Sequence, residues 1–156
     1  MRIITFLLIV SIGLGLTSCK GKEQSASTLQ KDERGWTTDY DGGIKEAKAM
    51  NKQALVLFTG SDWCRPCMML EGKVFQSDEF LQLSKDFVLV KLDFPRRKPM
   101  DPEIKKRNRS LANNFGVRGY PTVVALNSEG KEITRWVGFR PTDKEKYLSN
   151  LKALLK

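Results

Sequence analysis

The stretch Ala54–Lys73, ALVLFTGSDWCRPCMMLEGK, decides the fold of this 156-residue chain. It opens on an uninterrupted apolar run, Ala54–Phe58, which is typical of a strand buried in the centre of a sheet. Thr59–Asp62 carries turn residues. A helix is expected over about Cys64–Lys73, with Pro66 in its first turn, where the missing N–H costs little. The stretch therefore predicts a buried strand, a short turn and a helix that begins at a cysteine.

Outward from this stretch, helical and extended patterns alternate. A helix is predicted over Asp41–Asn51, where Ile44, Ala47 and Met50 recur every third residue. The later elements are, in order, a short helix with Ser77 as N-cap, a strand over Phe87–Phe94, a Pro-rich basic loop over 95–100, a helix over Pro102–Phe115 closed by Gly116, a strand over Pro121–Leu126, a turn over Asn127–Gly130, a strand over Glu132–Val137 and a helix from Thr142 or Asp143 to about Leu155.

Helical crossovers join the first two strands, which are therefore expected to be parallel, whereas the tight turn makes the last two antiparallel. The predicted fold is α/β, with a central mixed four-stranded sheet and helices on both faces. Apolar residues make up 40% of the chain and charged residues 29%, as in a globular domain.

The chain has no histidine, which excludes Ser-His-Asp and Cys-His catalysis and any His-ligated metal or haem. Its three cysteines are Cys19, Cys64 and Cys67. A structural zinc site needs about four ligands, so this set is a poor one. No metal and no cofactor are expected, and redox chemistry of the cysteines is favoured.

The N-terminal residues have the pattern of an export signal. Met1-Arg2 is basic, and Ile3–Leu16 is apolar but shorter than the roughly 20 residues that span a bilayer. The run ends in Leu16-Thr17-Ser18-Cys19, which resembles the lipobox of bacterial lipoproteins, where the cysteine receives lipid. Residues 1–18 are therefore expected to be a lipoprotein signal peptide. The alternatives are an ordinary cleaved signal peptide and an uncleaved anchor.

Residues 19–35 are expected to form a lipidated cysteine and a flexible polar tether, and residues 36–156 the folded domain. Export would place the domain where disulfides form. Lipid on Cys19 would leave Cys64 and Cys67 as a pair. Lys20 is not the inner-membrane-retention aspartate that some bacteria use, which favours the outer membrane.

The chemical motif is Trp63-Cys64-Arg65-Pro66-Cys67. At a helix N-terminus Cys64 faces unpaired N–H groups and the positive end of the helix dipole, which favour the thiolate, and Arg65 adds positive charge. Cys67 lies one turn later on the same face. Cys64 is thus the expected nucleophile and Cys67 the resolving thiol, with Trp63 packed beside them. A metal knuckle and an inert structural disulfide are the alternatives.

Together with Gly119-Tyr120-Pro121-Thr122, this motif resembles the thioredoxin superfamily, and bacterial exported thioredoxin-like proteins most closely, over roughly residues 36–156. The resemblance implies a thioredoxin fold. It also implies a cis peptide bond at Pro121, which would face the active-site disulfide, and a role for Tyr120 in pairing its backbone with the substrate strand.

The chain departs from the family at one position. Family members often carry a buried acid six residues before the first cysteine, where it helps to deprotonate the second; Phe58 stands there. Lys91 matches the strand lysine that usually neighbours this acid, and Lys91 or Asp93 could help instead. A solvated strand residue is the alternative for Lys91. Asp62 and Glu71 are interpreted as loop and helix-surface charges.

The predicted function is a thiol-disulfide oxidoreductase that reduces exported proteins, because Pro66 and the absence of histidine between the cysteines favour a reducing pair, against which Arg65 acts modestly. A membrane thiol electron donor is implied. The alternatives are an oxidase or isomerase and a non-catalytic peptide-binding module. A metal chaperone is disfavoured, because Met68 and Met69 are more often core residues.

Positive charge gathers in Arg96, Arg97, Lys98, Lys105, Lys106, Arg107 and Arg109, and the chain carries a net +9. Contact with an anionic membrane, an acidic partner or simple solvation would each account for it. No nucleic acid is expected, because aromatic residues that could stack on bases are not interleaved with the basic ones.

Overall fold

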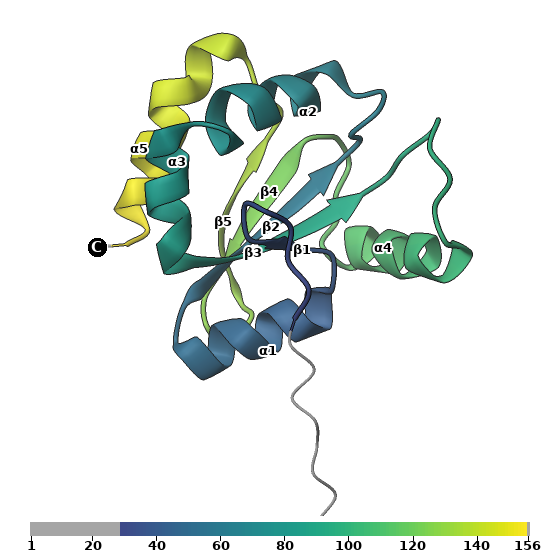
Figure 1. The fold of residues 1–156 in the computed structure, drawn as a ribbon, viewed down its shortest axis with the longest axis horizontal. Helices are drawn as coiled ribbons and strands as arrows, with labels where there is room; N and C mark the ends of the chain where they lie inside the picture. The colour runs from purple at the N-terminus through teal and green to yellow at the C-terminus, as the bar shows by residue number, and fades with distance from the viewer. Residues whose placement is uncertain (1–28, 156) are drawn as a thin grey trace, which may run out of the picture.

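A central sheet of five strands organises the domain in the computed structural model, which describes residues 29–155 (Figure 1). The strands are β1 (Trp36–Thr37), β2 (Gln53–Thr59), β3 (Phe87–Asp93), β4 (Thr122–Leu126) and β5 (Glu132–Val137), in the order β1-β3-β2-β4-β5. β3 runs parallel to β1 and β2, whereas β4 runs antiparallel to β2 and β5 to β4. The predicted mixed sheet is confirmed.

The sheet has one strand more than the four predicted. The extra strand, β1, has two residues, and it pairs Trp36 with Leu89 and Thr37 with Val90 at the edge formed by β3. Two residues are too few for a period-two pattern to stand out from its surroundings. Pairing with β3, which lies far along the chain, makes this segment a strand.

The helices are α1 (Tyr40–Met50), α2 (Arg65–Leu70), α3 (Asp78–Leu83), α4 (Pro102–Asn114) and α5 (Lys144–Ala153), with 3₁₀ turns at Ser84–Asp86 and Pro141–Asp143. Ser77 is the N-cap of α3, as predicted, and its hydroxyl accepts the N–H of Phe80. The helix expected over Cys64–Lys73 is α2 followed by a π-helical turn, η1 (Glu71–Phe75).

The two faces of the sheet pack against different helices, because side chains alternate along each strand. Leu55 and Leu57 of β2 join the core cluster with α2, η1, α3 and α5. Val56 and Phe58 join the opposite cluster, with α1 and α4 (Figure 1). The prediction of helices on both faces of the sheet is thus confirmed. The Cys64–Cys67 pair lies where the turn after β2 enters α2.

Part of the predicted tether lies against the domain. Lys31 bonds Glu46 of α1 at 2.7 Å, and the Asp32 carboxylate accepts the N–H groups of Arg34 and Trp36, each at 2.9 Å. These contacts hold the segment immediately before β1 against the domain. The predicted signal peptide, 1–18, and Cys19 lie outside the described residues. Within residues 29–155, no helix is long and apolar enough to cross a membrane.

Trp36 ties the short edge strand to the core, and its loss should show how much β1 contributes. Its ring is 3% exposed and lies 5.1 Å from Phe75 and 6.2 Å from Phe80. We expect Trp36→Ala to lower the free energy of unfolding by about 3–5 kcal/mol, as for other buried Trp truncations. Urea denaturation would measure it, with Val137→Ala, at a 65% exposed strand position, as the control. A loss below about 1 kcal/mol would show that β1 is dispensable to the core.

Candidate redox site

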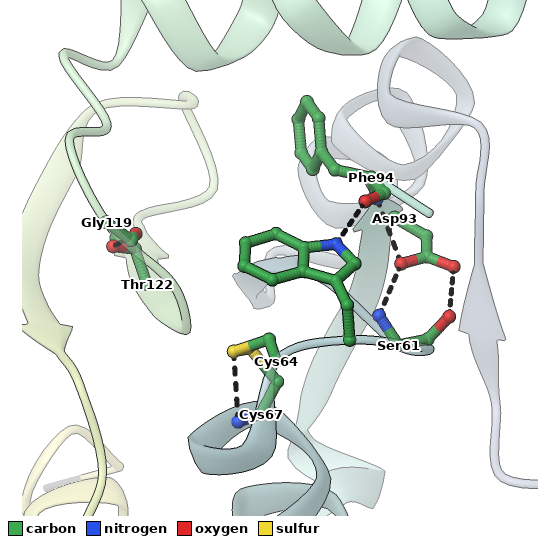
Figure 2. Close-up of a disulfide and its surroundings, with 8 residues drawn as sticks. Ser61, Cys64, Cys67, Asp93, Phe94, Gly119 and Thr122 are labelled. Carbon is green, nitrogen blue, oxygen red and sulfur yellow. Dashed lines mark hydrogen bonds between the residues drawn. A yellow bond between two sulfur atoms is a disulfide. The ribbon is translucent and has the colours of Figure 1, made fainter. Parts of the chain in front are cut away.

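The two cysteines of the motif are joined in a disulfide at the start of α2, with their Cα atoms 5.2 Å apart. Cys64 is the N-cap, and its Sγ accepts the backbone N–H of Cys67 at 3.3 Å (Figure 2). In the reduced protein the same N–H and the positive end of the helix can stabilise a Cys64 thiolate. Cys64 is 5% exposed and Cys67 3%.

Trp63 is held over the turn that precedes the disulfide. Its indole N–H donates to the carbonyl of Phe94 at 2.8 Å. A Cβ at Gly60 would lie 2.5 Å from the Trp63 ring, so this close approach requires glycine. The Arg96 guanidinium stacks on the Trp63 ring, 3.7 Å from the ring centroid. These contacts hold the Trp63 side chain in the turn that leads into Cys64.

Asp93, at the end of β3, fixes the turn from the neighbouring strand. Its carboxylate accepts the backbone N–H of Ser61 at 2.9 Å and the Ser61 hydroxyl at 2.6 Å (Figure 2). It also accepts the N–H of Phe94 at 2.9 Å. Asp93 thus holds the chain between β2 and α2, and it does not line the hollow beside Cys67 described below.

The loop Gly119–Thr122 lies across from the disulfide (Figure 2). The Tyr120–Pro121 peptide bond is cis, and the Thr122 hydroxyl donates to the Gly119 carbonyl at 2.8 Å. The Tyr120 ring stands edge-on to Trp63, with centroids 5.8 Å apart. This contact joins two segments far apart in sequence and places the cis-proline loop beside the Cys64–Cys67 turn.

A hollow of about 370 Å³ lies beside Cys67, and its lining includes Glu71 and Lys91. Lys91 Nζ lies 3.2 Å from the carboxylate of Glu71, and the Glu71 N–H donates to the carbonyl of Cys67 one turn earlier. Lys91 also lies 5.3 Å from the Trp36 ring centroid. Glu71 is a partly exposed helix charge, as interpreted, but the interpretation did not include its position beside Cys67 and its pairing with Lys91. Its spacing from Cys67, four residues on one helical face, was the available signal.

Phe58, six residues before Cys64, lies on the face of β2 that points away from α2. Phe58 belongs to the core cluster with α1 and α4, opposite α2. Leu57 faces α2 instead, and it pairs in register with Lys91. Both strand positions are apolar, and the charged groups that line the hollow beside Cys67 come from η1 and β3.

The basic loop over 95–100 is anchored by Asp62. Its carboxylate accepts the backbone N–H groups of Arg96, Arg97 and Lys98 at 3.0, 2.8 and 2.9 Å. These bonds, that from Arg96 foremost, hold the pKa of Asp62 below its ordinary value. The Asp62 carboxylate therefore fixes the backbone of this loop at three successive residues. Arg65 begins α2 and is exposed, with no ion pair in the described part of the chain.

The fold and the site together define a class. A Cys-x-x-Cys pair that opens a helix after the central strand of a mixed sheet, beside a cis-proline loop, is the arrangement of a thioredoxin-like thiol-disulfide oxidoreductase. Between residues 29 and 155, no three His, Cys, Asp or Glu side chains are grouped as metal ligands.

Comparison with known proteins supports the assignment to the thioredoxin-like class. The model of the thioredoxin-like domain family matches residues 40–152. The disulfide bond reductase DsbH of Chlamydia pneumoniae is 32% identical over 118 residues, which cover 75% of this chain and 70% of that protein. Thioredoxin H2 of Arabidopsis thaliana is 36% identical over 111 residues, 70% of this chain and 71% of that protein.

A solved DsbH oxidoreductase superposes with a TM-score of 0.66 at 27% identity, over 92% of this chain and 94% of that one. The chain therefore belongs to the thioredoxin-like domain family. It has the thioredoxin fold, and it is a thiol-disulfide oxidoreductase with a Cys64–Cys67 pair.

Removing the Asp62 charge should loosen the basic loop. We expect the amides of Arg96, Arg97 and Lys98 in Asp62→Asn to exchange hydrogen about five- to tenfold faster at pH 7, because their common acceptor is weakened. The folded-state pKa of Asp62 is lowered, so the stabilisation is present above the ordinary Asp pKa and is lost as pH falls through the lowered one. The gap between variant and wild type should therefore close in acid.

Hydrogen exchange followed by mass spectrometry would measure this effect. Asp86→Asn, at an exposed carboxylate, is the matched control. Equal exchange of the loop in Asp62→Asn and wild type at neutral pH would contradict the role given to Asp62.

Proposed function

We propose that the protein reduces disulfides of exported proteins through the Cys64/Cys67 couple. The observation that carries the proposal is the position of Cys64, whose Sγ already accepts a backbone N–H at the helix start. A reducing direction is supported by Pro66 and the absence of histidine between the cysteines. A relative named a disulfide bond reductase, 32% identical, also supports it.

In the first step the Cys64 thiolate attacks one sulfur of the substrate disulfide. A Cys64–substrate disulfide forms, and the other substrate sulfur leaves as a thiolate that takes up a proton. In the second step the Cys67 thiol loses its proton and attacks Cys64 Sγ. The Cys64–Cys67 disulfide forms, and the second substrate sulfur leaves as a thiolate, also to be protonated. Two electrons and two protons have then passed to the substrate.

Return to the dithiol requires two electrons from a thiol donor. We propose a membrane dithiol protein as this donor. The Cys64 Sγ that receives the substrate would also receive the donor thiolate, in the reverse order of steps.

The cis-proline loop is proposed to hold the substrate strand. Tyr120 precedes Pro121, and its ring packs on Trp63 beside the disulfide. Backbone groups at this position can pair with an extended segment that carries the substrate cysteines. Pro121 lacks an N–H, so it leaves no donor unpaired beside the sulfurs.

Glu71 is proposed as the proton acceptor for Cys67. Both side chains line the same hollow, and Glu71 follows Cys67 by one helical turn. Lys91, 3.2 Å from the carboxylate, keeps it oriented toward the hollow. A hollow of about 370 Å³ has room for water, through which the proton can pass from thiol to carboxylate.

The place of action is proposed from the N-terminal sequence. A lipid on Cys19, after removal of residues 1–18, would anchor the domain in the cell envelope, with the outer membrane favoured by Lys20. The substrates would then be exported proteins in a disulfide-forming compartment.

The alternatives make different predictions for one assay, the reduction of insulin by dithiothreitol. We expect catalysis by the wild type, no turnover in Cys64→Ser, and a trapped mixed disulfide in Cys67→Ser, because attack remains while resolution is lost. Non-reducing electrophoresis would detect the trapped species. A binding module would give no catalysis, and Cys64→Ser would change nothing.

The reduction potential of the Cys64/Cys67 couple shows whether the protein acts as a reductase or as an oxidase or isomerase. Equilibration with glutathione or dithiothreitol is expected to give a value near about −270 mV, as for reducing thioredoxins. A value between roughly −180 and −120 mV would make the protein an isomerase or oxidase.

Replacing Glu71 tests the proton acceptor. Glu71→Gln keeps the shape of the side chain but cannot take up the proton, so we expect resolution of a preformed mixed disulfide to slow by about 100-fold at neutral pH. The rate should recover as pH rises, because hydroxide can then remove the Cys67 proton. Stopped-flow release of a chromophoric thiol from Cys64 would follow this step.

Glu145→Gln is the matched control, since it removes an exposed carboxylate from α5. A Glu71→Gln resolution rate equal to that of the control across the pH range would exclude Glu71 from the step. It would leave the reductase proposal standing.

A further inference from the structure

A second hollow, of about 450 Å³, lies beside Trp63, between the basic loop and α4. Aromatic and basic side chains line it together. We call it the basic groove and define it by Trp63, Phe94, Arg96, Lys105, Arg109 and Tyr120. It is continuous with the site, because Trp63 and Tyr120 form its wall and also flank the disulfide turn.

The three cations of the basic groove have no acidic partner. Arg96, Lys105 and Arg109 are exposed, and none of them takes part in an ion pair within residues 29–155. Asp93 also lines the groove, and its carboxylate accepts from Ser61 and Phe94, while Asp62 accepts three loop N–H groups. With three cations and the single Asp93 carboxylate in its lining, the groove keeps a net positive charge.

These cations are also held close to the site. Arg96 stacks on Trp63 at 3.7 Å, and its backbone N–H is bound by Asp62. Burial raises the pKa of Tyr120, while the charges of Arg109 and Arg96 act in the opposite direction. Both guanidiniums thus act on the residue that precedes the cis-proline. Lys105 and Arg109 lie one turn apart on α4, on one face of that helix.

We infer that the basic groove binds an acidic segment of the substrate polypeptide next to its disulfide. This inference rests on the proposed function. A substrate strand that pairs with the backbone at Tyr120 continues past Trp63 into the groove. Each extended residue advances the chain by about 3.3 Å, so Asp or Glu side chains a few residues from the substrate cysteine can reach the three cations.

A polypeptide fits the groove better than a membrane surface does. Lys105 and Arg109 face a hollow with aromatic walls, not a flat surface. Aromatic rings and the stacked guanidinium can cover the apolar parts of a peptide, while carboxylates pair with the cations. The basic residues outside the groove, Arg97 and Lys106, lack such walls and serve as an internal comparison.

The test uses two disulfide-bridged peptides that differ only next to one cysteine, where one carries four Asp or Glu residues and the other Asn or Gln. The full-length wild-type protein is expected to reduce the acidic peptide with about tenfold higher kcat/KM. We expect this ratio to fall toward one in Lys105→Gln/Arg109→Gln, and at high salt, which screens the charges. The control, Arg97→Gln/Lys106→Gln, also removes two positive charges, one from the basic loop and one from α4, and should keep the ratio.

Each outcome has a meaning. Equal kcat/KM for both peptides, or an equal loss of the ratio in both double variants, would overturn the inference and leave the reductase function intact. If the wild type reduces neither peptide, the proposed function fails. Fluorescence titration with the acidic peptide, its cysteines replaced by serine, then decides whether the groove binds it. Binding to phosphatidylglycerol vesicles that depends on Lys105 and Arg109, without any preference among peptides, would assign the groove to the membrane instead.

Discussion

The bonds from Ser61 to the Asp93 carboxylate are the constraint on which the site depends. They attach the turn after β2 to the end of the neighbouring strand, at 2.9 and 2.6 Å. With the turn fixed, Gly60 lets the Trp63 ring close down on the backbone. The chain then enters α2 with Cys64 at its N-cap. A helix start so placed supplies an N–H group that can stabilise a thiolate, and none of the buried residues in the described part of the chain is charged.

Two hollows of different chemistry lie near the redox site, one lined by Cys67 and the other by Trp63. In the first hollow, Glu71 and Lys91 form an ion pair beside Cys67, where the proposed proton transfer would occur. In the second hollow, three cations without an ion pair in residues 29–155, three aromatic rings and Asp93 surround the proposed substrate site. Each half of the exchange reaction thus has its own surroundings. The Cys64–Cys67 turn is the element common to both.

Local pattern was sufficient for most of the fold and for the reacting atoms. The apolar run of β2, the turn and the Cys-x-x-Cys helix were predictable because each depends on neighbours in sequence. Strand β1 was not, because two residues become a strand only through pairing with Leu89 and Val90. The spacing of Phe58 from Cys64 did not show which side of β2 it faces, because successive residues of a strand point to opposite faces of the sheet. Glu71 was overlooked because its partner, Lys91, lies on another element.

The placement of Glu71 has a mechanical consequence. An acid carried on β2 would belong to the sheet, and any shift of α2 would change its distance from Cys67. Here the acid and both sulfurs lie on one continuous helical segment, since η1 extends α2 without a break. Nucleophile, resolving thiol and acid therefore move as a single rigid body when the helix moves. Such a segment retains its internal geometry while the surrounding loops adapt to substrates of different shape.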